Sequence, residues 1–370
     1  MMKTDVLRYY EDDHFDAFWD NQVTDYPLDR FPWYDMILAV VQEVNPKCDD
    51  LSELHNFFDR TEIVPLRKKV ERYVRTKEFA EKLDEYFDYI IGDQMPEYLI
   101  QATPTLNFVL PDQQRQGGLL TFHTGHLTAY NPEINTIWTP VSPAWGSNSM
   151  QVCTWEDSKR ITKEMVEENL SLSEIQRRCE EVSWPVEIKQ GQALLFGQGY
   201  WHGNINNTTG KSRIGLDVRA MPRGYEHGYR KPGSYSRFPG TTLDVPTVDP
   251  DRRWIVFNDP AAGDYMGTMP FYIPRQFIEL YADKLGIKPV GWHNEYMYTD
   301  WNPHLEFFIN ETEVEGIALL SMHGLSSTIN RRMELFEQCV NKGIHVLFCD
   351  ENFLLDSREG LDYIKKCLEF

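Results

Sequence analysis

The sequence lacks the features that define several large classes of protein. Its 370 residues contain no run of about 18 uninterrupted apolar residues, which a membrane-spanning helix requires. Positive charge is scarce, because 37 Lys and Arg stand against 57 Asp and Glu, a formal net charge of −20. Such an acidic protein repels nucleic acid and anionic membranes, so we expect neither as a partner. The GxGxxG, GxxxxGK[ST] and GxSxG motifs are absent, which argues against a nucleotide cradle and a serine nucleophile elbow.

Cysteine is also sparse and carries no recognisable pattern. The six cysteines show neither CxxC spacing nor a zinc-ligand arrangement, so we expect reduced and mostly buried thiols. Residues 1–15 are rich in acidic side chains and lack the apolar run of a signal peptide, which predicts a cytoplasmic protein. What is present is 41% hydrophobic residues and 13% aromatic residues, enough for a large core divided between about two domains.

Hydrophobic periodicity separates a helical segment from a β-rich one. Residues 1–95 are predicted to be helical, because Phe79, Leu83, Phe87 and Ile91 recur every four positions on one face. Residues 96–222 contain short apolar runs separated by turn residues, which predict a β-sandwich or barrel interrupted by one helix at Glu164–Val182. The predicted strands are Leu119–His123, Ile134–Val141, Ser149–Cys153, Ala193–Phe196 and Ser212–Arg219.

Composition changes again near residue 222. Twelve of the 46 residues 222–267 are Pro or Gly, against 44 of 370 in the whole chain, so residues 223–268 are interpreted as a loop-rich linker. In residues 269–370, apolar strand-length runs alternate with helical segments, which predicts a small α/β domain with a parallel sheet.

Two histidines are candidates for metal binding. His123 ends one apolar run, and His202 follows another after a short turn. Imidazoles at strand ends near the mouth of a barrel are well placed to share one metal ion, whereas a single histidine is more often structural. We therefore predict a metal site at this pair.

Arg213 begins a predicted strand eleven residues after His202. Alternation places Arg213, Asp217 and Arg219 on one face of that strand and apolar residues on the other. Two arginines inside a barrel require anionic partners. Asp217 can neutralise one of them, which leaves the other for a ligand carboxylate; the alternative is a set of ordinary salt bridges on an exposed strand face.

Several sequence blocks in residues 95–222 together resemble a known family. They are His123, Asn131-Pro-Glu-Ile-Asn-Thr-Ile-Trp-Thr-Pro140, Gly146-Ser-Asn-Ser-Met150, His202-Gly-Asn204 and Asn207-Thr-Thr-Gly-Lys-Ser-Arg213. Their order resembles the Fe(II)/2-oxoglutarate-dependent oxygenases, in particular the phytanoyl-hydroxylase-like subgroup found with streptomycin and surface-sugar biosynthesis. The resemblance implies a double-stranded β-helix, or jelly roll. It also implies His123 and His202 as iron ligands and Arg213 as the residue that binds the distal carboxylate of 2-oxoglutarate.

The sequence departs from that family at Gly125. Members usually have an acidic residue two positions after the first histidine, completing a 2-His-1-carboxylate site. The third position could be filled by water or by another carboxylate such as Glu133, and His126 could also contribute. Chloride could enter, as in halogenases with Gly or Ala at this position, or the site could be degenerate. If the position is vacant, Gly125→Asp is expected to tighten metal binding.

Residues 269–370 resemble a second family, small proteins of sporadic bacterial carbohydrate clusters. The similar segments are Met269–Gln276, Asn294–Tyr296, Val314–Ser321 and Lys342–Phe348. No activity follows from this resemblance, but both families imply surface-polysaccharide biosynthesis. We therefore predict an oxygenase acting on a small sugar or nucleotide-sugar substrate, by hydroxylation or halogenation. The alternatives are a non-catalytic scaffold and a cupin-like sugar isomerase, and the protein could form homo-oligomers.

A local basic cluster follows the predicted barrel. Arg223, Arg230, Lys231 and Arg237 fall within 15 residues that contain a single acidic residue. We expect this loop to cover the mouth of the pocket and to bind the diphosphate of an anionic sugar donor. The alternative is a set of salt bridges at a domain interface.

Overall fold

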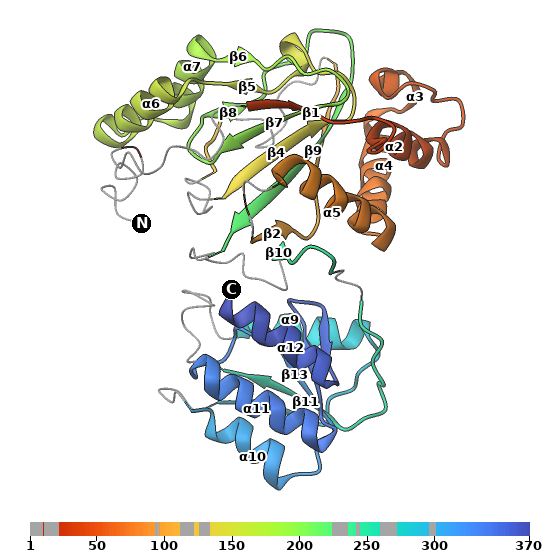
Figure 1. Ribbon diagram of the computed structural model, residues 1–370, viewed down its shortest axis with the longest axis vertical. Coiled ribbons are helices and arrows are strands. Elements are labelled where there is room, and N and C mark those ends of the chain that lie inside the picture. The colour runs from red at the N-terminus through yellow and green to blue at the C-terminus, as the bar shows by residue number, and fades with distance from the viewer. Residues whose placement is uncertain are drawn as a thin grey trace. The chain divides into compact units, whose positions relative to one another are not determined.

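The chain divides into two compact units in the computed structural model, Met1–His227 and Gly228–Phe370 (Figure 1). The structure describes residues 10, 22–92, 95, 97–111, 122–125, 134–223, 236–241, 245–259, 272–295 and 301–370. Each unit contains a β-sheet with helices packed on it.

A large antiparallel sheet forms the centre of the first unit. Its order is β1-β7-β4-β9-β2, with β3 also paired to β9. The strands are β1 (Gln22–Asp25), β2 (Tyr98–Gln101), β3 (Thr105–Val109), β4 (Asn135–Pro140), β7 (Gln192–Gly197) and β9 (Arg213–Pro222). The predicted runs at Ile134–Val141, Ala193–Phe196 and Ser212–Arg219 are thus confirmed as strands. The run Leu119–His123 lies mostly outside the described residues.

A second, smaller antiparallel sheet packs against the large one. It has the order β6 (Trp184–Pro185), β5 (Gln151–Val152), β8 (His202–Gly203). Trp138 and Leu194 of the large sheet share a buried cluster with Val152 of the small sheet. Their sequence neighbours Ile137 and Leu195 point the other way, into a cluster with the N-terminal helices. This alternation is that of a sheet buried on both faces, one against the helices and the other against the small sheet, as in a β-sandwich.

The N-terminal helices cover the outer face of the large sheet. They are α2 (Trp33–Gln42), α3 (Leu54–Phe57), α4 (Arg60–Tyr73) and α5 (Lys77–Ile91), with a 3₁₀ turn η2 (Leu51–Glu53). The α5 face predicted from the four-residue spacing is confirmed, because all four of its apolar residues are buried. Thr76 caps the helix by accepting a hydrogen bond from the main-chain nitrogen of Phe79, and Gly92 ends it.

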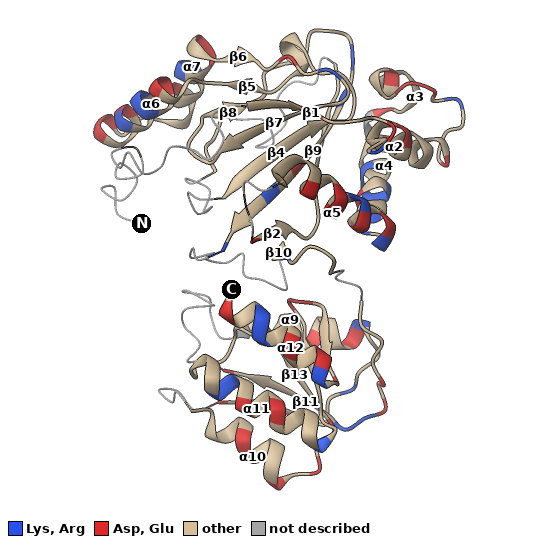
Figure 2. Cartoon of the chain, in the orientation of Figure 1, with Lys and Arg blue, Asp and Glu red and all other residues tan. Residues whose placement is uncertain are grey.

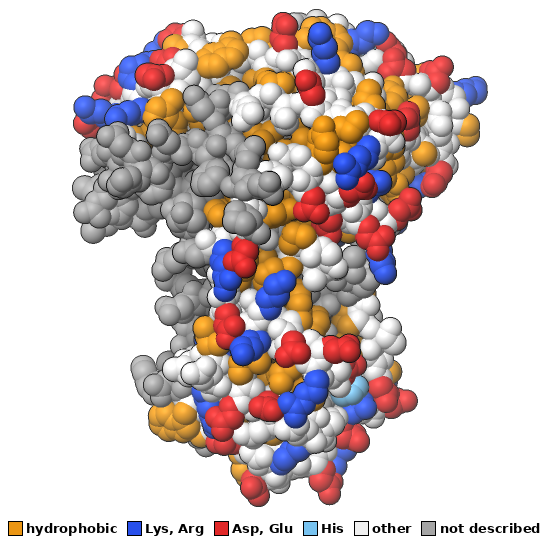
Figure 3. All heavy atoms as spheres, in the orientation of Figure 1, with side chains coloured by type: hydrophobic (Ala, Val, Ile, Leu, Met, Phe, Trp, Pro, Cys, Tyr) orange, Lys and Arg blue, Asp and Glu red, His pale blue; other side chains and the backbone are white. Residues whose placement is uncertain are grey.

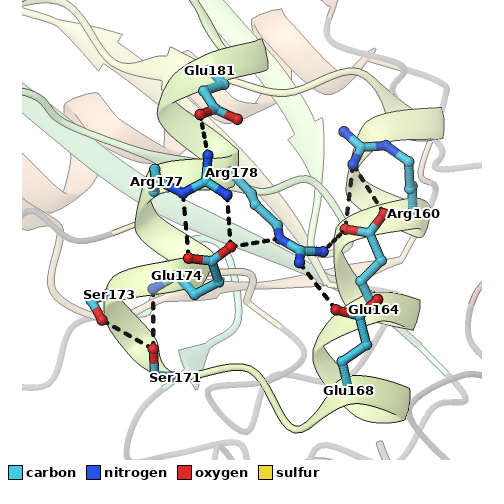
Figure 4. A network of polar contacts seen from close by, with 9 residues as sticks. All are labelled: Arg160, Glu164, Glu168, Ser171, Ser173, Glu174, Arg177, Arg178 and Glu181. Atoms are coloured by element: carbon cyan, nitrogen blue, oxygen red, sulfur yellow. Dashed lines mark hydrogen bonds and ion pairs between the residues drawn. The ribbon is translucent and has the colours of Figure 1, made fainter.

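Two helices, rather than the one predicted over Glu164–Val182, pack on the small sheet. They are α6 (Trp155–Glu168) and α7 (Leu172–Val182), and a further 3₁₀ turn, η5, spans Gly146–Asn148. The break arises because Asn169 takes a left-handed conformation and Ser171 caps the next helix. Arg178 joins the two helices through ion pairs with Glu164 and Glu168 of α6 and Glu174 of α7 (Figure 4).

The second unit is an α/β domain around a mainly parallel sheet. The strand order is β12 (Gly291–Asn294), β11 (Trp254–Asn258), β13 (Gly316–Leu319), β14 (His345–Phe348), β15 (Phe353–Leu355), and only β15 runs antiparallel. The helices are α9 (Tyr272–Lys284), α10 (Pro303–Glu311), α11 (Ile329–Lys342) and α12 (Arg358–Glu369), and a short strand β10 spans Ser236–Arg237. The predicted parallel sheet is therefore confirmed.

The interpretation of residues 223–268 as linker was wrong for β11. All five residues of β11 are buried, and the strand pairs with both β12 and β13. The Pro- and Gly-rich residues on either side of so short a strand concealed it in the sequence. The second unit accordingly includes residues that the sequence assigned to the linker.

Charge and burial follow the layers of each unit. Strands are largely free of charged residues, whereas the helices carry acidic and basic residues in alternation (Figure 2). On the face shown in Figure 3 the two signs are interspersed. All six cysteines are buried free thiols, as expected. Among the described residues, no helix combines the length and hydrophobicity that crossing a membrane requires.

Candidate metal and carboxylate site

His123 and His202 lie side by side between the two sheets. Their main chains form an antiparallel bridge, with the nitrogen of His123 2.9 Å from the oxygen of His202 and the reverse pair 3.0 Å apart. The ring centroids are 4.4 Å apart. This bridge brings together two residues that lie 79 positions apart in the chain, as the metal-site prediction required.

The His202 ring is held in one orientation. Its Nδ1 lies 2.8 Å from the main-chain oxygen of Tyr200. A carbonyl can only accept, so Nδ1 carries the proton and Nε2 keeps its lone pair. Burial, and next the neighbouring His123, hold the pKa of His202 well below its usual value. The neutral imidazole that results is the form that binds metal ions.

The position two residues after His123 has no space for a side chain. A Cβ built on Gly125 would lie 1.7 Å from Oε1 of Gln198 and 2.6 Å from its Cδ. Gln198 is buried, and its Nε2 donates to Oγ1 of Thr136 at 2.8 Å. The volume that an acidic residue 125 would need is therefore filled by a carboxamide from the end of β7.

Within the described part of the chain, no three His, Cys, Asp or Glu side chains are grouped closely enough to hold a metal ion. His126 and Glu133, both expected as contributors, lie outside the described residues. The pair His123 and His202 is thus the candidate metal site.

Arg213 is a buried cation. Its side chain is 1% exposed, and its guanidinium lies 5.1 Å from the centre of the Trp138 ring. Nη2 donates to Oδ1 of Asn204 at 2.7 Å, whereas Nε has no hydrogen-bond partner among the described residues. Burial lowers the pKa of Arg213 to about 10. Because an unpaired buried charge costs several kcal/mol, this arrangement favours an anionic ligand at Arg213.

The inward face of β9 carries the charges that alternation predicted. Asp217 accepts a hydrogen bond from Nδ2 of Asn107 at 2.7 Å, and burial raises its pKa, against the effect of Arg219 and Arg213. Arg219 donates to Oε1 of Gln101 at 2.9 Å. The exposed strand face considered as an alternative is wrong for Arg213. Apolar residues of the same strand face the helices instead.

The basic cluster expected over the pocket is described only in part, and its two described residues fall in different units. Arg223 pairs with Glu97, with Nη1 2.7 Å from Oε2. Arg237 is 1% exposed in the second unit and donates from Nη1 to the main-chain oxygen of Thr241 at 2.8 Å. The binding of a diphosphate by this cluster stays a prediction. Arg230 and Lys231 lie outside the described residues.

Three polar residues of the site were not identified from the sequence. Gln198 fills the space beside Gly125, Asn204 contacts Arg213, and Gln176 of α7 hydrogen-bonds the main chain of Phe122. Asn204 follows His202 by two positions, and this proximity is the sequence feature that could have identified Asn204 as a site residue. Gln176 lies 53 positions from His123 in sequence, so nothing local connects them.

Comparison with known proteins gives partial similarity. No known family profile matches the chain. A streptomycin biosynthesis protein, StrG of Streptomyces griseus, is 27% identical over 148 residues, which are 40% of this chain and 58% of that protein. The chain therefore matches little more than half the length of this relative.

Solved structures show distant likeness. A non-heme monooxygenase, ThoJ in its nickel complex, has 12% identity and a TM-score of 0.32, over 57% of this chain and 77% of its own. The non-heme alpha ketoglutarate dependent carbocyclase SnoK from nogalamycin biosynthesis has 10% identity and a TM-score of 0.29, over 60% and 84%. AviO1 from Streptomyces viridochromogenes has 11% identity and a TM-score of 0.31, over 58% and 96%. All three TM-scores lie below 0.5, so the likeness of these structures to this chain is only partial.

Proposed function

We propose that this protein is a non-heme Fe(II)/2-oxoglutarate-dependent oxygenase with a jelly-roll core. Its proposed substrate is a small sugar or nucleotide-sugar of surface carbohydrate biosynthesis. His123 and His202 would hold the metal, and Arg213 would bind the distal carboxylate of 2-oxoglutarate. When bound, the metal and 2-oxoglutarate would together supply the activation of O₂ for oxidation of a C–H bond.

The burial of Arg213 carries this proposal. A guanidinium that is 1% exposed, with one neutral acceptor and no carboxylate within ion-pair distance among the described residues, fits a ligand carboxylate. Trp138 lies against the guanidinium and supports it by a cation–π contact. The His123 and His202 rings, whose centroids lie 4.4 Å apart, fit a divalent metal.

The chain's own residues have three further tasks. Tyr200 fixes the His202 tautomer through its main-chain oxygen, so that Nε2 is available to the metal. Asn204 orients Arg213. Phe196, whose ring lies 4.9 Å from that of His202, and the other apolar residues between the sheets would exclude water from the reacting carbon.

The substrate class is supported by the sequence resemblance and by the relative named for streptomycin biosynthesis. Halogenation remains the second reaction type considered, because Gly125 has no carboxylate. A scaffold without metal and a cupin-like isomerase make different predictions, since neither consumes 2-oxoglutarate.

The proposal is tested by supplying Fe(II), 2-oxoglutarate and O₂ to the purified protein and measuring succinate. We expect succinate formation that rises with a panel of nucleotide-sugars and is lost in His202→Ala. The half-buried His345→Ala variant of the second unit is the matched control and should retain it. Binding of metal without any succinate would favour the scaffold, and isomerised sugar without O₂ consumption would favour the isomerase.

A further inference from the structure

The parallel sheet of the second unit has a topological switch point between β11 and β13. The chain passes from β11 to β12 on one side, and then to β13 on the other side of β11. Helix α9 shares a buried cluster with Leu347 of β14, whereas Phe336 of α11 contacts the next residue of that strand, Phe348. Neighbouring residues of a strand face opposite sides, so the helices that follow β11 and β13 lie on opposite faces of the sheet. Open α/β sheets bind ligands at the carboxyl ends of the strands at such a point.

One buried carboxylate lies at this switch point and joins the connections that follow three strands. Asp259 directly follows β11 and is 4% exposed. Its Oδ2 accepts hydrogen bonds from the main-chain nitrogen and the hydroxyl of Ser326, both at 2.8 Å, and from Nδ2 of Asn302 at 2.7 Å. Ser326 belongs to the connection after β13, and Asn302 to the connection between β12 and α10. The connections after β11, β12 and β13 therefore meet at Asp259.

Two polar groups next to this carboxylate are buried without a partner. The Asn302 side chain is fully buried, and its Oδ1 has no hydrogen-bond partner among the described residues. Because Nδ2 of the same amide donates to Asp259, this oxygen lies beside the carboxylate. Ser327 follows Ser326 directly and is 2% exposed, and its hydroxyl also lacks a partner in the described part of the chain. Buried polar groups are rarely left unpaired, so these two indicate a partner that binds from outside the chain.

An exposed indole borders the two unpaired groups. Trp301 directly precedes Asn302 and is 52% exposed. Its main-chain oxygen accepts a hydrogen bond from Nε of Arg331, in the first turn of α11, at 3.1 Å. Ser327 directly precedes Thr328, which caps the same helix. Trp301, Asn302 and Ser327 therefore lie together at the start of α11.

We propose that this switch point binds a vicinal diol of a neutral sugar ring. The residues of the proposed site are Asp259, Trp301, Asn302 and Ser327. One ligand hydroxyl donates to Oδ1 of Asn302, and its neighbour accepts from the hydroxyl of Ser327. The Trp301 indole offers an apolar surface to the ring. A free sugar and the ribose of a nucleoside share this chemistry, and the inference is independent of a metal at the two histidines of the first unit.

The charges around the site disfavour an anionic group such as a phosphate. The Ser326 nitrogen, a donor that a phosphate at a helix start would use, already donates to the Asp259 carboxylate. Arg331 is paired with Glu306 and with Glu334, each at 2.7 Å. A neutral diol matches one amide oxygen and one hydroxyl without bringing a second negative charge next to Asp259.

The test measures binding of named probes to the full chain by saturation-transfer NMR. The probes are uridine, 2′,3′-dideoxyuridine, the methyl glycosides of glucose, galactose and mannose, and inorganic phosphate. Binding of uridine but not of dideoxyuridine assigns the ribose of a nucleoside as the ligand. Binding of a methyl glycoside but of neither nucleoside assigns a free sugar. Wild type that binds none of the diols, or binds only phosphate, overturns the inference.

Ser327→Ala shows whether the binding occurs at this site. The change removes a hydroxyl that has no partner among the described residues, so Tm should equal or exceed that of wild type. The affinity for the diol probe should fall about 10-fold, and Trp301→Ala should lower it to a similar extent. His345 begins β14 at the opposite edge of the same sheet, so His345→Ala should bind the probe as wild type does. Unchanged diol affinity in Ser327→Ala would place the binding elsewhere in the chain and overturn the inference.

Discussion

The Gln176 carboxamide makes two hydrogen bonds to the main chain of Phe122, one to its N–H and one to its C=O. Its Oε1 accepts from the nitrogen of Phe122 at 2.6 Å, and its Nε2 donates to the oxygen of Phe122 at 2.8 Å. Phe122 precedes His123 directly, so helix α7 holds the segment that bears one of the two histidines. Both Gln176 and Phe122 are buried, and water cannot replace these two hydrogen bonds easily.

Gln176→Ala should therefore destabilise the first unit and loosen the metal site. Leaving two buried main-chain groups unsatisfied costs about 2–4 kcal/mol of unfolding free energy. Urea unfolding measures this cost, and a Co(II) titration should show weaker binding than in wild type. Gln192→Ala, which removes a partly exposed glutamine, should change stability by less than about 0.5 kcal/mol. Equal stability of the two variants would show that these two hydrogen bonds contribute nothing.

Residue 215 must be a glycine because the Trp138 indole, which contacts Arg213, leaves no space for a side chain there. A Cβ at residue 215 would lie 2.9 Å from Nε1 of Trp138 and 3.3 Å from Nη1 of Arg213. Gly215→Ala should thus displace the indole, cost about 1–3 kcal/mol of stability and weaken 2-oxoglutarate binding. The same change in a Trp138→Phe background should cost less, because the ring nitrogen is gone. A double-mutant cycle that shows strict additivity would contradict this contact.

Glu351 makes the second unit sensitive to pH. The residue is fully buried, accepts hydrogen bonds from the Ser321 hydroxyl and the Met322 nitrogen, and burial raises its pKa from 4.5 to about 8. The folded state therefore keeps a proton that the unfolded state releases above about pH 4.5. Stability conferred by the protonated form is complete at acidic pH and is lost progressively as pH rises toward 8.

Glu351→Gln should remove this dependence. Between pH 5 and pH 8, wild type is expected to lose on the order of 3 kcal/mol more stability than the variant does. Hydrogen exchange of the β13 and β14 amides, corrected for intrinsic rates, measures the difference within the second unit. Parallel pH profiles for wild type and Glu351→Gln would show that Glu351 does not carry the effect.

Strong periodic patterns predicted the larger part of the fold. The four-residue spacing in α5 and the two-residue alternation in β9 both hold in the structure, because one face of each element is buried against a neighbour. The α6–α7 break and strand β11 were missed. Asn169 and Ser171 end α6 and begin α7, and the sequence pattern did not reveal this break. Strand β11 was missed because Pro and Gly residues flank it.

The candidate site was predicted only in part, for a physical reason. His123, His202 and Arg213 stand out because imidazole and buried guanidinium have few other uses between apolar strands. Gln198 was not recognised from the sequence, because a glutamine next to glycines is common in turns. Only the three-dimensional packing shows that the Gln198 side chain fills the space beside Gly125. The burial of Arg237 was likewise not predictable, because nothing in the loop-rich sequence around it indicates a buried position.

The proposed arrangement is a single site that holds one metal at His123 and His202 and one 2-oxoglutarate at Arg213. It is tested most directly by anaerobic titration of the Fe(II)-loaded protein with 2-oxoglutarate, followed by visible absorption. We expect one equivalent of 2-oxoglutarate to bind and to give a new charge-transfer band. The affinity for 2-oxoglutarate should fall on the order of 100-fold in Arg213→Met but not in Arg223→Met. Absence of the band, or equal affinity in Arg213→Met and wild type, would contradict it.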